Sequence, residues 1–256
     1  MHNDTINDKR EYYMEMLILV PKITNRLYYI FELMLKDELG IDFKFTTDKD
    51  SYLSHEGAKL HYGKYPMPEE SGLYQQAANI LFEHDIADQD VKICNYKESK
   101  AIYPVFNEKS LFPFDIFAAS FYIISRYEEY LPHVSDNYNR FQPQDSILYK
   151  MEMMERPVIN LWSIDLGNEL VARYPEITLK KKTFRFVPTY DVDAAWAYRN
   201  KGFFRTTLSL CRDILRFDKN EIKYRWDVLR KKKMDPFDTF EYQIKLQKEQ
   251  QMLFVN

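Results

Sequence analysis

The sequence has little cysteine, little glycine and no long hydrophobic run. Its 256 residues include two cysteines, Cys94 and Cys211, which lie far apart and match no metal-binding spacing. This excludes a disulfide framework, and we expect both thiols to pack as apolar groups. Six glycines are few for an enzyme that depends on many tight loops. The longest apolar run near the start, Met16 to Val20, is too short for a signal peptide or a membrane span, which predicts a cytoplasmic protein without membrane contact.

Charge is spread unevenly along the chain. The net charge of −3 does not suggest a nucleic-acid partner. From residue 181 onward, however, 17 Lys and Arg face 10 Asp and Glu, a balance of +7 against −10 for the residues before it. The asymmetry fits two units of different origin, or part of a protein seen without the surface that balances its charge. With 45% hydrophobic residues, the chain has enough apolar side chains to bury a core.

Hydrophobic periodicity predicts an α/β domain over residues 1–180. "EMLILVP" reads as a buried strand, Thr24 can cap a helix from about Asn25 to Leu39, Gly40 can end it, and "IDFKF" reads as the next strand. We expect loops and a short hairpin over residues 48–72. Two further helices are predicted, a long buried one over residues 114–131 and another over residues 161–174.

A second unit is predicted over residues 181–256. "FRFVPTYD", residues 184–191, reads as a strand, and "FFRTTLSLCRDILRF" and "EIKYRWDVLRKKK" read as helices. Another helix is expected to begin near Asp235 and Pro236, and "MLFVN" has the pattern of a strand.

Two carboxylates, Asp191 and Asp193, follow the strand predicted over residues 184–191. Alternate residues of an extended chain project to one side, so we expect both acids to face a common cavity while Val192 points into the core. Like charges so close repel each other unless a cation, a proton or a substrate joins them. Such a pair can divide the work of metal-assisted hydrolysis, one acid holding a cation and the other accepting a proton from water. A short acidic pair also fits a solvated turn or a helix cap.

Several stretches together resemble a known enzyme family. "TYDVDAAWAYRNKG", residues 189–202, resembles the first motif of the NodB-homology polysaccharide deacetylases, and "DPFDTFEYQ", residues 235–243, looks like the segment before their second barrel strand. "FDIFAASFYIISRYEEYLP" and "ERPVINLW" are similar to an α/β domain of unknown function that precedes such units. The resemblance implies an N-terminal α/β domain followed by the first part of a (β/α) barrel, and metal-dependent removal of an N-acetyl or O-acetyl group from a carbohydrate.

The resemblance also implies roles for single residues. Asp191 would be the general base, Asp193 a ligand of the catalytic zinc or a similar divalent metal, and Trp196 and Tyr198 would line the sugar cleft or pack in the interior. The five histidines all precede Asp191, so the family's two metal-binding histidines are missing. We therefore expect this chain to be an inactive fragment of a longer deacetylase, with no expectation for its oligomeric state.

Other classes remain open. Haloacid-dehalogenase-like phosphatases and sugar-nucleotide transferases also use D-x-D, although Ala194 and Ala195 stand where the phosphatases usually have Gly-Thr. Residues 1–180 can also be a non-catalytic module that binds a carbohydrate or a partner, with Trp162, Tyr127 and Tyr130 stacking on sugars or buried in the core. His55 and His61 are expected at the surface, and residues 230–233, "RKKK", at a solvated helix end.

Overall fold

The computed structural model describes residues 15–67, 72–184, 186–200, 202, 204, 207, 208 and 219–249. The chain divides between Lys181 and Lys182 into two compact units. Unit 1 comprises the residues up to Lys181, and unit 2 those from Lys182 onward.

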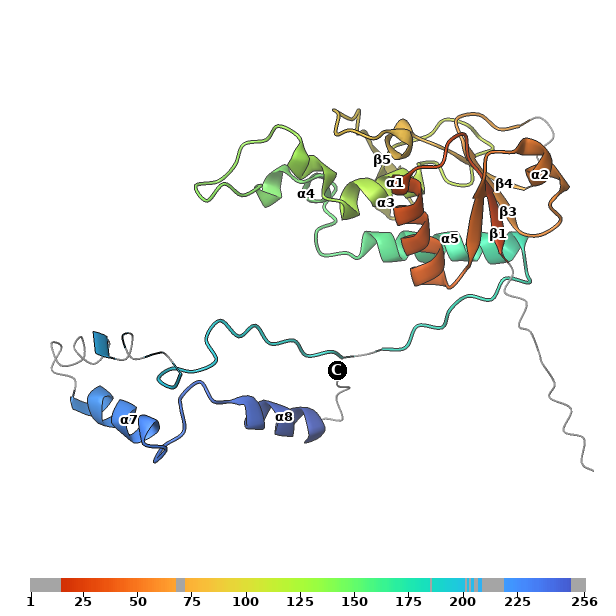
Figure 1. Ribbon diagram of the computed structural model, residues 1–256. Helices are drawn as coiled ribbons and strands as arrows, with labels where there is room; N and C mark the ends of the chain where they lie inside the picture. Colours follow the sequence, from red (N-terminus) through yellow and green to blue (C-terminus); the bar gives the residue numbers. More distant parts are fainter. Residues whose placement is uncertain are drawn as a thin grey trace, which may run out of the picture. The chain divides into compact units, whose positions relative to one another are not determined.

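Unit 1 is built on a small parallel sheet. Its strands are β1 (Met16–Leu19), β2 (Phe43–Thr46), β3 (Lys59–Gly63) and β4 (Leu73–Gln76), in the order β2-β1-β3-β4. All three pairings are parallel. In Figure 1, helices α1 and α3 lie to one side of the strands and α2 to the other. The α/β class predicted for the N-terminal domain is confirmed.

The expectation of loops and a hairpin over residues 48–72 is wrong. This stretch contains α2 (Lys49–Ser54) and the buried, parallel strand β3. Two polar residues of β3, Lys59 and His61, interrupt the apolar run by which a buried strand is recognised in a sequence. The ammonium of Lys59 donates to the carbonyls of Tyr52 and His55 at 3.2 and 2.8 Å, which satisfies the end of α2. His61 is buried rather than at the surface, with its ring 5.3 Å from that of Tyr74.

The first helix follows its sequence signals. Thr24 caps α1 (Asn25–Phe31) by accepting a hydrogen bond from the Leu27 N–H at 3.2 Å. The helix continues as a wider π-helical segment, η1 (Glu32–Leu39), and Gly40 ends it at φ 75°. Only glycine adopts this left-handed conformation at little cost, so the predicted stop is confirmed.

The core of unit 1 lies between the sheet, α1, α3 (Ile116–Ile124) and α5 (Val158–Arg173). Phe31 stacks on Phe117 with ring centroids 3.9 Å apart, and Trp162 packs 5.1 Å from Phe114. The long helix predicted over residues 114–131 is shorter than expected. Arg126 takes a left-handed φ of 52°, and a 3-10 turn, η3 (Tyr127–Tyr130), follows it.

Shorter elements surround this core. They are η2 (Asn79–Phe82), the antiparallel hairpin β5 (Ile93–Tyr96) and β6 (Ser99–Ile102), η4 (Pro143–Asp145) and α4 (Ile147–Lys150). Across the part of the chain that the structure describes, no helix is long and apolar enough to cross a bilayer.

Unit 2 contains α7 (Lys219–Leu229), which overlaps a predicted helix, and α8 (Phe240–Glu249). The helix predicted to begin near Asp235 and Pro236 starts later, at Phe240. The strand predicted over residues 184–191 is absent from the described residues there, which form neither helix nor strand. The helix predicted in residues 203–217 and the strand in residues 252–256 fall largely or wholly outside the described residues. A deacetylase-type barrel is therefore not confirmed.

Candidate functional site

The acid pair lies on an irregular and exposed segment. Asp191 and Asp193 are both exposed, and Val192, expected in the core, keeps 49% of its surface exposed. Extended pairing with neighbouring strands would bury Val192, and no such strand flanks it among the described residues. Asp191 and Asp193 thus stand at the surface of unit 2 and not at the tip of a described strand.

The described residues do not by themselves form the zinc site that the resemblance implies. Within them, no group of three or more His, Cys, Asp or Glu side chains is placed to hold a metal ion. A catalytic zinc usually has three protein ligands and one open position. Asp191 and Asp193 supply two carboxylates at most.

A buried carboxylate fixes the backbone at residues 197–199, a few positions after the acid pair. Asp235, 2% exposed, accepts hydrogen bonds from the N–H groups of Ala197 at 2.7 Å, Tyr198 at 2.8 Å and Arg199 at 3.2 Å. A fourth comes from the Phe237 N–H at 3.1 Å. Burial acts to raise the pKa of Asp235, but the four donors outweigh it and the pKa lies below its ordinary value.

Side chains reinforce this connection between residues 190–199 and the start of α8. The Trp196 ring packs edge-on against Phe240 with centroids 5.9 Å apart. Arg199 pairs with Asp238 at 3.6 Å, and the Gln247 amide donates to the Tyr190 hydroxyl at 3.1 Å.

Tyr198 connects the same segment to α7. Its hydroxyl donates to Glu221, and the Arg225 guanidinium lies 4.7 Å from its ring centroid. Burial, with the Glu221 carboxylate second, raises the pKa of Tyr198 to about 12. Trp196 and Tyr198 are both half-buried and take part in the packing of unit 2. Their role towards a sugar stays a prediction.

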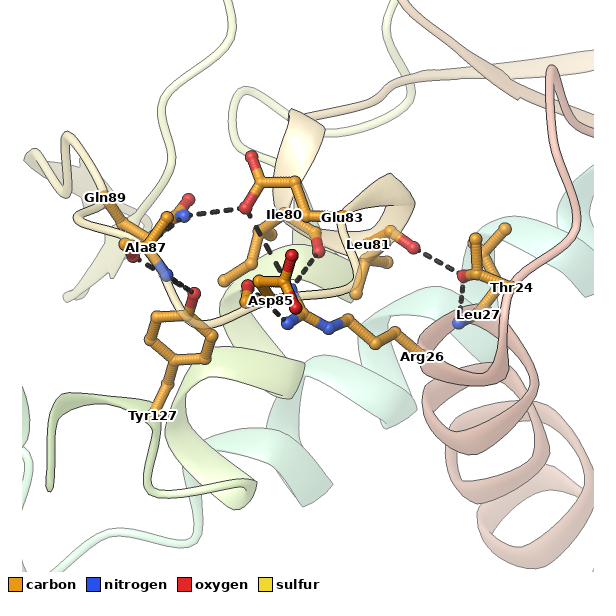
Figure 2. Close-up of polar contacts among 10 residues, drawn as sticks. All are labelled: Thr24, Arg26, Leu27, Ile80, Leu81, Glu83, Asp85, Ala87, Gln89 and Tyr127. Atoms are coloured by element: carbon orange, nitrogen blue, oxygen red, sulfur yellow. Dashed lines mark hydrogen bonds and ion pairs between the residues drawn. The ribbon is translucent and has the colours of Figure 1, made fainter. Parts of the chain in front are cut away.

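A second polar network lies in unit 1, just beyond the carboxyl end of β1. Open α/β sheets commonly bind ligands at this edge. Figure 2 shows the Arg26 guanidinium directed at the segment after β4. It donates to the Ile80 carbonyl at 2.7 Å and the Asp85 carbonyl at 2.9 Å, and lies 4.0 Å from the Glu83 carboxylate. Its carbon also lies 5.4 Å from the Phe121 ring centroid.

Two hydroxyls hold the same segment in place. The Thr24 hydroxyl donates to the Leu81 carbonyl at 2.5 Å. The Tyr127 hydroxyl accepts from the Ala87 N–H at 2.9 Å and lies 3.1 Å from its carbonyl (Figure 2). Residues 79–89, which we name the strap, are therefore held by hydrogen bonds against Thr24 and Arg26, which follow β1, and against Tyr127. Trp162 and Tyr127, considered as sugar-stacking residues, are buried in the core, whereas Tyr130 is 69% exposed.

A third carboxylate, Asp115, lies fully buried at the N-terminus of α3. It accepts hydrogen bonds from the Tyr62 hydroxyl at 2.7 Å, from Ala78 N–H at 2.6 Å, and from the N–H groups of Phe117 and Ala118. Burial raises its pKa to about 6, against the opposing effect of these donors. Sequence reasoning missed this residue, although an Asp directly before the apolar run "IFAAS" is a helix-cap signal.

These features define unit 1 as an α/β domain on a four-stranded parallel sheet. Residues 16–175 match the family of unknown function DUF7033, and the chain belongs to that family. The matched region contains the sheet, the strap and α5, and it ends before the acid pair. No curated protein and no solved structure matches the chain.

Proposed function

We propose that this chain contributes the first catalytic motif of a metal-dependent carbohydrate deacetylase, which hydrolyses an N-acetyl or O-acetyl group. One observation carries the proposal. The two stretches that resemble the deacetylases, residues 189–202 and 235–243, lie together in unit 2, where Asp235 of the second binds three backbone amides of the first. Stretches 36 to 38 residues apart thus form one cluster.

Within this proposal Asp191 accepts a proton from the water that attacks the acetyl carbonyl, and Asp193 binds the divalent cation. Asp235 fixes the backbone at residues 197–199, a few positions after the pair. Because the described residues offer no third metal ligand, the proposal requires two more ligands from another chain segment.

The test is acetate release by the natural protein that contains this sequence, assayed on N-acetylated and O-acetylated oligosaccharides. We expect Asp191→Asn to lower kcat at least about 100-fold, because a neutral amide accepts no proton. Asp227→Asn, a charge change on α7 of the same unit outside both deacetylase-like stretches, serves as the matched control and is expected to retain activity.

Two outcomes contradict the proposal. One is the absence of acetate release from every acetylated glycan by a natural protein that binds a divalent metal. The other is hydrolysis of phosphate esters that depends on Asp191, since this would assign the pair to a phosphatase.

A further inference from the structure

Three adjoining cavities form an open groove on unit 1, and no residue of the strap lines them. Their volumes are about 780, 370 and 380 Å³, and Arg156 lines all three. The walls are the turn of the β5–β6 hairpin, the segment from α4 to Arg156, and the first turns of α5. Each cavity has the size of a small-molecule site, and together they suit a chain better than a single ring.

One wall is fixed to α5 by polar contacts. Asp165 of α5 accepts hydrogen bonds from the Tyr96 hydroxyl at 2.9 Å and the Lys97 ammonium at 2.5 Å. Lys97 takes a left-handed φ of 51° in the two-residue turn of the hairpin. The position of the turn over α5 is therefore set before any ligand binds.

The opposite wall, the segment from α4 to Arg156, is also fixed by contacts within unit 1. Glu128 accepts from the Ser146 hydroxyl at 2.7 Å and the Ile147 N–H at 2.8 Å, which fixes the start of α4. Met151 and Met153, 1% and 4% exposed, insert into the core beneath the following residues. A site whose walls are already ordered loses less conformational entropy on binding.

Four polar side chains that line the groove lack an intramolecular partner among the described residues. Across the described part of the chain, the structure gives no hydrogen bond or ion pair to the side chains of Arg156, Glu155, Glu98 or Gln144. A guanidinium donates, carboxylates accept, and an amide does both. This mixture matches sugar hydroxyls, because each hydroxyl can donate and accept.

An exposed aromatic ring and an equal number of positive and negative side chains in the groove favour an uncharged sugar as the ligand. Tyr149, 52% exposed, and Met154, 50% exposed, line the largest cavity and offer an apolar surface on which a sugar ring can stack. Four cationic and four anionic side chains line the three cavities. The balance favours an uncharged ligand, because a charged chain would meet like charges along the groove.

We propose that this groove binds a neutral oligosaccharide, stacked on Tyr149 and hydrogen-bonded by Arg156, Glu155 and Gln144. The inference rests on the proposed carbohydrate chemistry and extends it, since it specifies an uncharged glycan and a binding surface on unit 1. An open groove without a deep pocket gives weak binding per site, with a Kd on the order of 0.1–1 mM.

The test is isothermal titration of the full chain with tetrasaccharides of different charge. The probes are the neutral tetramers of N-acetylglucosamine and glucose, the cationic tetramer of glucosamine and the anionic tetramer of galacturonate. We expect saturable binding of at least one neutral tetramer and at least about tenfold weaker binding of both charged ones.

Variants assign the binding to the groove. Tyr149→Ala and Arg156→Ala should each weaken binding of the neutral tetramer at least about tenfold, without a change in thermal unfolding. Tyr138→Ala, which removes an aromatic ring 79% exposed outside the groove, and Lys109→Ala, which removes an exposed cation, should leave it unchanged.

The inference is overturned if neither neutral tetramer saturates, if a charged tetramer binds as tightly, or if both groove variants bind like the wild type. Asp191→Asn separates this result from the proposed activity. It should leave the titration unchanged while acetate release by the natural protein is lost, so failure of either proposal is visible without the other.

Discussion

Two buried aspartates, Asp115 in unit 1 and Asp235 in unit 2, each accept four hydrogen bonds, yet their pKa values move in opposite directions. Burial raises the pKa of Asp115 to about 6. At Asp235 the donors outweigh burial, and the pKa falls below its ordinary value. The number of donors is the same, so the surroundings make the difference.

The surroundings of the two aspartates differ because the two units are stabilised by different kinds of interaction. The buried apolar side chains of the described residues belong to unit 1, with Val228 as the single exception in unit 2. Arg225, Asp235 and Gln247 are the other buried residues described in unit 2, and all are polar. Among the described residues, unit 1 is thus stabilised mainly by apolar burial and unit 2 by hydrogen bonds and cation–aromatic contacts, whose net contributions are smaller.

The largest loss of stability is expected when Asp115 is substituted. Asp115→Ala removes the cap of α3 and leaves the Tyr62 hydroxyl and the Ala78 N–H without their acceptor, so the free energy of unfolding of unit 1 should fall by about 4 kcal/mol. Urea unfolding at pH 7 measures the change. Asp48→Ala removes the exposed cap of α2 and should lower the free energy of unfolding by clearly less. Equal losses for both variants would contradict the importance assigned to burial.

The pH dependence of unfolding tests the raised pKa of Asp115. Its pKa is about 3.8 ordinarily and about 6 in the fold, so between these pH values the folded protein binds more protons than the unfolded chain. The contribution of Asp115 to stability is therefore greatest below about pH 4 and decreases by up to about 3 kcal/mol as pH rises to about 6.

Asp115→Asn provides the reference for this measurement, because the amide does not titrate. The difference in unfolding free energy between wild type and variant should shrink as pH rises from 4 to 7. A difference independent of pH would contradict the raised pKa. Asp235 acts in the opposite sense, since its contribution is lost only as pH falls below its ordinary value of 3.8, outside this window.

The sequence predicts those parts of the fold that depend on neighbours along the chain. Thr24 and Gly40 mark the ends of the first helix because capping and the left-handed stop need only local groups. Strand β3 was not predicted, because Lys59 and His61 are polar residues that a sequence pattern assigns to the surface. The carbonyls that satisfy Lys59 belong to a helix that was not predicted.

The sites depend even more on distant residues. Asp115 and Tyr62 lie 53 positions apart, and no local pattern connects them. Asp235 was predicted as a helix start, but its three amide partners lie 36 to 38 positions earlier. Asp191, Asp193, Trp196 and Tyr198 were selected from local sequence, and the structure brings Trp196 and Tyr198 into the packing while leaving the acids exposed.

A smaller effect is expected at the strap of unit 1. Arg26→Met keeps much of the side chain's apolar stem and removes the donors to the Ile80 and Asp85 carbonyls, so opening of residues 79–89 should become easier by about 2 kcal/mol. Limited proteolysis and amide exchange within the strap measure this. Glu83→Gln removes the 4.0 Å ion pair, while its amide oxygen can still accept the hydrogen bond from the Gln89 amide, so strap opening should change by less than about 0.5 kcal/mol. Equal opening in both variants would show that charge, not the carbonyl contacts, holds the strap.

The smallest effect is expected for Asp235→Asn in unit 2. In the wild type one carboxylate oxygen accepts from Ala197 and Phe237, and the other from Tyr198 and Arg199. Whichever way the new amide is turned, two of the four N–H groups face a donor instead of an acceptor. The local cost should be about 1 kcal/mol, because the side-chain oxygen that remains still accepts from one of the two pairs of N–H groups.

Amide exchange resolves this change residue by residue. In Asp235→Asn, one pair of these amides should exchange about five- to tenfold faster, as about 1 kcal/mol implies, while the other pair changes less. Asp238→Asn removes the 3.6 Å contact to Arg199 but no backbone acceptor, and should leave all four rates nearly unchanged. If both variants accelerate exchange equally, the surface ion pair and not the buried carboxylate holds the segment that follows Asp193.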